Sequence, residues 1–117
     1  MPEGGYAVTR LGQLQSRNRE SEYLVAHLKH RDIDMRWKAA RLLGEMRGQG
    51  IDLLMKALYD DDRGVRLLAA WALGKTKDIR AADALIRASP DENSDVQLAI
   101  DGAIQRLSRT CIVAGLL

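Results

Sequence analysis

One segment of this chain recurs at a spacing of about thirty residues, and this repeat restricts the folds that the chain can adopt. The segment DMRWKAARLLG (residues 34–44) aligns with GVRLLAAWALG (residues 64–74), so that Arg36 falls on Arg66. A degenerate third copy, DVQLAIDGAIQ, occupies residues 95–105. Self-similarity at this period is typical of helical-repeat proteins, in which each unit buries its apolar face against its neighbours. The pattern therefore predicts a stack of similar units.

A second amphipathic segment precedes each copy, so each unit reads as two helices joined by a polar turn. A leucine twelve residues before the aligned Arg or Gln marks its position: Leu24, Leu54 and Leu85. The composition favours helices, because Ala and Leu dominate and Phe is absent. We expect first helices near residues 15–29, 50–59 and 79–88, and second helices near residues 33–46, 63–76 and 93–107.

Acidic side chains and glycines mark the expected ends of these helices. The expected N-caps are Asp32 or Asp34, Asp62 and Asp78. The expected helix stops are Gly44, Gly74 and the Gly48–Gly50 turn.

A chain of 117 residues has room for one domain. We expect a flexible or loosely packed segment at residues 1–14, followed by a repeat domain at residues 15–107. Its three repeats are expected at about residues 15–46, 50–76 and 79–107. The apolar tail at residues 108–117 is expected to cap the last repeat, because it would otherwise expose apolar surface to water.

The aligned pattern, D-x-(D)-x-x-V-R-x-x-A-A-x-x-L-G, resembles the HEAT repeat, and more narrowly the short HEAT-like repeats of phycobilisome lyases. The resemblance covers about residues 20–107, and the second copy fits best. It implies an all-α fold, a short α-solenoid of about three HEAT-like helical pairs. It says little about chemistry, because one fold can carry many functions. The lyase and hydroxylase activities of longer family members are not supported by residues here, since this chain has no His-Glu dipeptide.

The resemblance also implies a structural ladder between repeats, in which an Asp at the turn pairs with an Arg six residues later. The residues of this chain that match are Arg36, Asp60, Arg66 and Asp91. Only the middle copy has both partners. The first copy has His30 in place of the Asp, and the third has Gln97 in place of the Arg.

Charge and cysteine content limit the function classes. The formal net charge is only +2, so the chain lacks the basic excess typical of a nucleic-acid-binding domain. The single cysteine, Cys111, excludes an internal disulfide and a multi-cysteine zinc site, and it favours a reducing, cytoplasmic location. No apolar stretch approaches 18 residues, so no membrane association is expected.

Two clusters superficially suggest a metal site. His27 and His30 lie three residues apart, but they are the only histidines and no cysteine is near. The acidic run at residues 60–64 has its glycine at the fifth position, and Trp71 stands at the twelfth, so it does not match a calcium loop. The sequence predicts no metal, no cofactor and no catalytic residue.

The two tryptophans are the most informative residues for function. Trp37 and Trp71 occupy variable positions of the repeat, on a stripe of the second helices that would face a concave surface. Helix spacing would place their indoles roughly 10–13 Å apart. An aromatic patch edged by cations resembles a binding hot spot. The residues expected to contact a protein partner are Trp37, Lys38, Arg41, Leu67, Leu68, Trp71 and Lys75.

Several alternatives remain open at this point. The tryptophans are also compatible with completing a thin core, with self-association through the patch or the apolar tail, and with nucleic-acid binding, which the near-neutral charge disfavours. A further alternative is an accessory or chaperone subunit of an enzyme. The sequence thus predicts a non-catalytic interaction or scaffold module with a protein partner of unknown identity.

Overall fold

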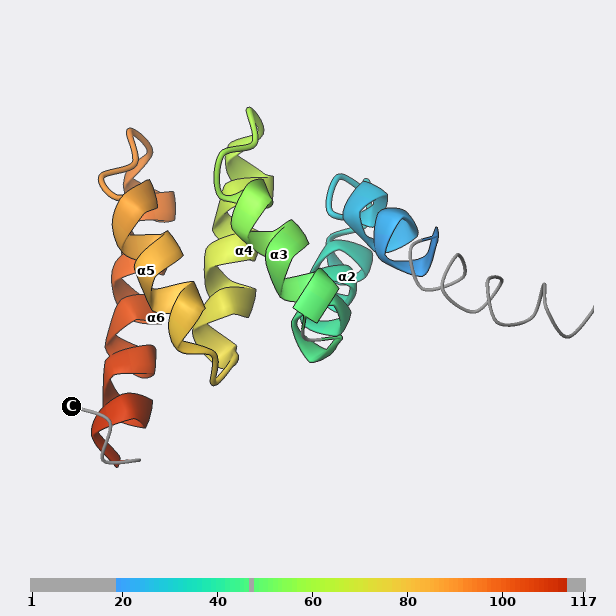
Figure 1. The fold of residues 1–117 in the computed structure, drawn as a ribbon. Helices are drawn as coiled ribbons and strands as arrows, with labels where there is room; N and C mark the ends of the chain where they lie inside the picture. The colour runs from blue at the N-terminus through green and yellow to red at the C-terminus, as the bar shows by residue number, and fades with distance from the viewer. Residues whose placement is uncertain (1–18, 47, 114–117) are drawn as a thin grey trace, which may run out of the picture.

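The computed structural model describes residues 19–46 and 48–113, with side chains as far as residue 109. This part of the chain is helical and contains no strand. Residues 19–27 form a helix. The helices that follow are α2 (Ile33–Glu45), α3 (Gly48–Ala57), α4 (Arg63–Lys75), α5 (Ile79–Ala88) and α6 (Ser94–Val113). Consecutive helices pair, and the pairs lie side by side in a row (Figure 1), which confirms the predicted all-α solenoid.

The second helix of the first two repeats and the first helix of the third begin at an aspartate N-cap. The side chains of Asp32, Asp62 and Asp78 each accept a hydrogen bond from the backbone N–H two residues later. This contact satisfies one of the amide donors that a helix leaves unpaired at its N-terminus. Of the two candidates at the start of α2, Asp32 is therefore the cap.

The glycines have a different role from the one expected. α2 and α4 continue one residue past Gly44 and Gly74, so neither glycine ends its helix. A Cβ added at Gly74 would lie 2.7 Å from the Cβ of Ala103, so this glycine allows α4 and α6 to approach closely. The expected Gly48–Gly50 turn is instead the first turn of α3. Sequence spacing marks these glycines but does not distinguish a stop from a close helix contact.

α4 is the centre of the core. It contacts α2, α3, α5 and α6, which explains why it is apolar over most of its circumference. Its buried residues are Val65, Leu68, Ala69, Ala70, Ala72, Leu73 and Gly74. In the view of Figure 1, α4 lies between α2 and α6. At the end of the row, α6 carries exposed Asp101 and Gln105 where α4 has buried Ala70 and Gly74.

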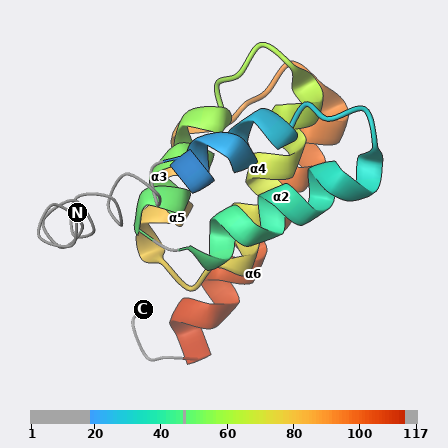
Figure 2. The ribbon, with the colours of Figure 1, turned by 90° about the vertical axis from the view of Figure 1, so that its right-hand side faces the viewer.

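The last helix ends later than the expected limit at residue 107. α6 runs to Val113, so residues 108–113 continue a helix rather than start a separate tail. Figures 1 and 2 show the last turns of α6 extending beyond the neighbouring helices. The expected flexible segment at residues 1–14 and the last four residues of the tail lie outside the described residues. None of the helices in the described part is long and apolar enough to cross a membrane.

Candidate interaction groove

Trp37 on α2 and Trp71 on α4 contact each other edge to face. Their ring centroids are 4.6 Å apart and the rings are inclined by 87°. Both side chains are partly buried and pack against the core. The expected separation of 10–13 Å is therefore wrong, because it followed helix spacing and ignored how far an indole reaches across the gap between two helices. Edge-to-face packing is a favoured geometry for aromatic pairs.

A groove of about 770 Å³ opens beside Trp71. Its walls come from three repeats: α2 of the first, α3 and α4 of the second, and the α4–α5 turn with the start of α5 of the third. The lining residues are Arg41, Gly44, Glu45, Ile51, Trp71, Ala72, Lys75, Thr76, Lys77, Asp78 and Ile79. An apolar floor with a few charged groups at the rim is typical of binding sites.

The carboxylates at the rim already have cationic partners. Arg41 Nη1 lies 3.8 Å from Glu45 Oε1. Asp78 pairs with Arg80 at 2.8 Å, and the hydrogen bonding and charge of Asp78 raise the pKa of the Arg80 guanidinium.

The two lysines of the rim differ from the carboxylates. Lys75 Nζ lies 4.9 Å from the centre of the Trp71 ring, in the geometry of a cation–π contact. Within the described part of the chain, neither Lys75 nor Lys77 has a carboxylate partner. These two ammonium groups are the rim charges that no carboxylate of residues 19–46 and 48–109 balances.

Some of the residues expected to contact a partner line the groove, and others lie outside it. Arg41, Trp71 and Lys75 line the groove, and Trp37 packs behind Trp71. Leu67 is partly buried against the core. Lys38 is exposed on α2 but does not line the groove.

Leu68 was expected at the surface and is instead a core residue, only 4% exposed. It belongs to the central repeat, where neighbouring helices cover both sides of α4. It therefore offers no surface to a partner.

Sequence reasoning missed the groove residues that lie outside the second helices. Lys77 lies in the α4–α5 turn, and Ile79 begins α5 with its side chain 53% exposed. One signal was available: aligning the first helices of repeats two and three places Ile79 on Gly48. An isoleucine at an exposed helix start, where the preceding repeat has glycine, is not required by the repeat itself.

Two ion pairs join the second repeat to the third: an exposed one, between Arg80 and Asp52 at 3.7 Å, and a largely buried one, between Arg66 and Asp91. Arg66 Nε and Nη2 donate to the two carboxylate oxygens of Asp91 at 2.9 and 3.3 Å, and Nη1 donates to the carbonyl oxygen of Asp60 at 2.9 Å. The Arg66 and Asp91 side chains are 11% and 8% exposed. Burial acts to raise the pKa of Asp91, but hydrogen bonds from the Asn93 N–H and from Arg66, with the charge of Arg66, outweigh it and hold the pKa low.

Apart from Arg66 and Asp91, the residues of the expected Asp–Arg ladder form no ion pair with one another. Asp60 pairs with Lys29 at 3.4 Å, and Arg36 makes no side-chain hydrogen bond or ion pair with any described residue. At the far end, Gln97 Oε1 accepts a 2.6 Å hydrogen bond from the Asp91 N–H. Gln97, which stands where the second repeat has Arg66, therefore binds the third turn through a neutral side chain.

His30 takes over the turn contact that aspartate makes in the other repeats. Its Nδ1 accepts a hydrogen bond from the Asp32 N–H at 2.9 Å. In the same way, Asp60 accepts from the Asp62 N–H and Asp91 accepts from the Asn93 N–H, each at 2.9 Å. The imidazole nitrogen therefore substitutes for a carboxylate oxygen in the first repeat.

The histidine pair takes part in a row of ring contacts at the end of the first helix. The His27 ring lies 4.1 Å from Tyr23 and 5.3 Å from His30, measured between centroids. The described residues contain no cluster of three side chains that could hold a metal ion.

The comparison with known families agrees with this architecture. The model of the HEAT repeats matches residues 21–105. None of the curated proteins with which the sequence was compared matches it. HEAT repeats are in general non-catalytic modules for protein interaction and scaffolding. Because the match covers most of a chain that folds as a row of helical pairs, this protein belongs to the HEAT-repeat family.

Proposed function

We propose that this protein is a non-catalytic interaction module that binds a protein partner in the groove beside Trp71. The observation that carries the proposal is the Trp71 indole, which remains partly exposed on the wall of a groove with an apolar floor. Tryptophan is strongly enriched among residues that dominate binding energy, particularly beside a pocket that excludes water.

The position of the Trp71 ring is restricted from two sides. The Trp37 ring packs against it edge to face, with the centroids 4.6 Å apart, and Lys75 Nζ lies 4.9 Å from the centroid of the Trp71 ring. A side chain that is already held in place loses little conformational entropy when a partner binds. This restriction supports a binding role in addition to the contribution that both rings make to the core.

The groove is also supported by the contact between repeats. Its walls come from three repeats, so its shape depends on how those repeats stack. The buried Arg66–Asp91 pair fixes the second repeat against the third, and close packing of Gly74 on Ala103 does the same at the other end of α4. A groove that is rigid before binding favours affinity and specificity.

A pull-down with matched isoleucine variants tests the proposal. Ile79 and Ile86 lie on the same helix and are 53% and 58% exposed, but only Ile79 lines the groove. Biotinylated wild-type protein, Ile79→Glu and Ile86→Glu would be incubated with lysate of the source organism, and bound proteins would be quantified by mass spectrometry. Trp71→Ala provides a second groove variant, and circular dichroism confirms the fold of each.

We expect a set of proteins that wild type and Ile86→Glu retain equally and that Ile79→Glu and Trp71→Ala lose. A catalytic chain in this set would assign the module to an enzyme complex as an accessory subunit. Equal recovery by all four folded proteins would contradict a binding role for the groove.

A further inference from the structure

We infer that the groove beside Trp71 takes an acidic segment of the partner, in which an apolar side chain is flanked by carboxylates. This inference rests on the proposed function and adds the chemistry of the partner. Its basis is the charge on the groove rim: both rim carboxylates have cationic partners, whereas the described residues give the two rim ammonium groups no carboxylate.

Each rim carboxylate has a cation within ion-pair distance. Asp78 caps α5 by accepting from the Arg80 N–H at 2.9 Å, and it also receives the Arg80 guanidinium at 2.8 Å. Glu45 has Arg41 one helical turn away, at 3.8 Å. A cation on the partner would have to compete with these neighbours, so the rim does not favour a basic segment.

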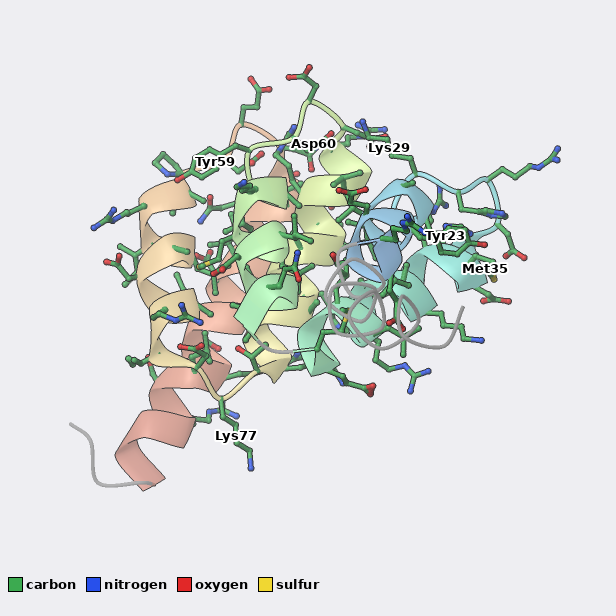
Figure 3. All side chains as sticks on the ribbon, turned by 45° about the vertical axis from the view of Figure 1, so that its right-hand side comes forward. Tyr23, Lys29, Met35, Tyr59, Asp60 and Lys77 are labelled. Carbon is green, nitrogen blue, oxygen red and sulfur yellow. The ribbon has the colours of Figure 1, made fainter. Side chains whose placement is uncertain are left out.

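The lysines present the opposite situation. Lys75 Nζ lies over the Trp71 ring, and Lys77 projects from the α4–α5 turn at the lower edge of the molecule in Figure 3. Among the described residues no carboxylate lies within ion-pair distance of either Nζ. A carboxylate on the partner would therefore gain two cations without displacing an existing ion pair, and this electrostatic match would favour an acidic partner.

The apolar residues that line the groove favour an apolar side chain of the partner. Ile51, Ala72 and Ile79 all line the groove; the first two are 3% and 2% exposed, and Ile79 is 53% exposed. A side chain that enters the groove would meet the Trp71 indole and the exposed Ile79 among its lining residues. Burial of apolar area then supplies affinity, and the carboxylates on either side fix orientation.

A nucleic acid fits the same rim less well. Its phosphates would meet the Lys75 and Lys77 ammonium groups, but also the carboxylates of Glu45 and Asp78. The formal net charge of the whole chain is only +2, whereas binding to a phosphate backbone usually requires several cations along one surface. The observations therefore favour a polypeptide.

Selection from a phage-displayed library of random dodecapeptides tests this inference directly. The library would be panned against the full chain, and the recovered peptides would be synthesised with a fluorophore. Binding would be measured by fluorescence polarisation to wild type, to the Lys75→Glu/Lys77→Glu double variant, and to Lys56→Glu. Lys56 is an exposed lysine of α3 that does not line the groove, so it controls for net charge.

We expect groove-dependent peptides enriched in Asp and Glu around a Leu, Ile or aromatic residue. Their Kd should rise about ten-fold or more for the double variant, and change less than two-fold for Lys56→Glu, as a rim charge pair predicts. A peptide whose acids are replaced by Lys should regain affinity for the double variant. Raising the salt concentration should weaken the wild-type complex.

Other outcomes would overturn the inference. Peptides that require Trp71 and Ile79 but show no acidic enrichment would leave the proposed function standing and remove the acidic partner. A selection that recovers no groove-dependent peptide would argue against both. Tighter, groove-dependent binding of a single-stranded 20-mer DNA would replace the polypeptide with a nucleic acid. Dimerisation in light scattering that Ile79→Glu abolishes would assign the groove to a second copy.

Discussion

Trp37 and Trp71 come from neighbouring repeats and meet edge to face, with centroids 4.6 Å apart. This contact connects the fold to the candidate site, because Trp37 packs against the core while Trp71 also lines the groove. The first repeat therefore positions a side chain that belongs to the second. Substitutions at Trp37 should affect both the stability of the protein and binding in the groove.

Trp37→Ala tests this connection. Removing a partly buried indole should lower the free energy of unfolding by about 2–3 kcal/mol, and Trp37→Phe should recover much of the loss because it restores an aromatic contact. Urea denaturation gives the stability, and the near-ultraviolet circular dichroism of the remaining indole reports its order. An ordered Trp71 signal in Trp37→Ala would show that the contact does not hold Trp71.

Asp91→Asn tests the largely buried ion pair between the second and third repeats. The pKa of Asp91 is held below its ordinary value of 3.8, so the charged carboxylate stabilises the folded state above that pH. This stabilisation is lost as the pH falls through the lowered pKa. At pH 7 we expect Asp91→Asn to cost about 2–3 kcal/mol, because it leaves Arg66 without a carboxylate.

The pH dependence separates this charge effect from a packing effect. Urea midpoints of wild type and Asp91→Asn, measured from pH 7 down to pH 2, should converge below pH 3.8 as the wild-type carboxylate is protonated. A difference that stays constant over this range would show that the ion pair does not contribute.

Much of the fold follows from the sequence because the repeat is periodic and its signals are local. The spacing of apolar residues gives the helices, and aspartates such as Asp62 mark where they begin. The candidate site was predicted only in part. Arg41, Trp71 and Lys75 lie on the second helices, where the repeat pattern points, whereas Lys77 and Ile79 reach the groove through a turn.

Two other residues show where sequence spacing was insufficient. Leu68 looks like a surface leucine in an alignment, but helices on both sides of α4 bury it. The distance between the indoles depends on side-chain direction as well as on helix positions, so no alignment gives it.

His30 offers a test of the turn before α2. Its Nδ1 accepts from the Asp32 N–H, as Asp60 and Asp91 do in their own turns. His30→Ala should lower the free energy of unfolding by about 1 kcal/mol, since an exposed backbone donor loses its partner. His30→Asp should restore most of this loss at pH 7. Equal thermal unfolding of the Ala and Asp variants would show that the turn does not need a side-chain acceptor.

Two glycines on packed helices should respond oppositely to the same substitution. Gly74→Ala places a Cβ 2.7 Å from that of Ala103, and the resulting separation of α4 and α6 should cost about 1–3 kcal/mol. Gly102→Ala meets no atom within 4 Å and should stabilise α6 by about 0.5–1 kcal/mol. Chemical denaturation of both variants checks the pair. A stabilising Gly74→Ala would contradict the close approach of the two helices.

The groove itself is tested most directly by amide chemical-shift mapping. The ¹⁵N-labelled chain would be titrated with the tightest peptide from the library selection, and shifts would be followed residue by residue. We predict that the largest shifts fall on Gly44, Ala72, Lys75, Lys77 and Ile79, and that the Trp71 indole N–H shifts with them. Shifts concentrated instead on the opposite edge, at Asp61 and Glu92, would contradict the assignment of the groove as the partner site.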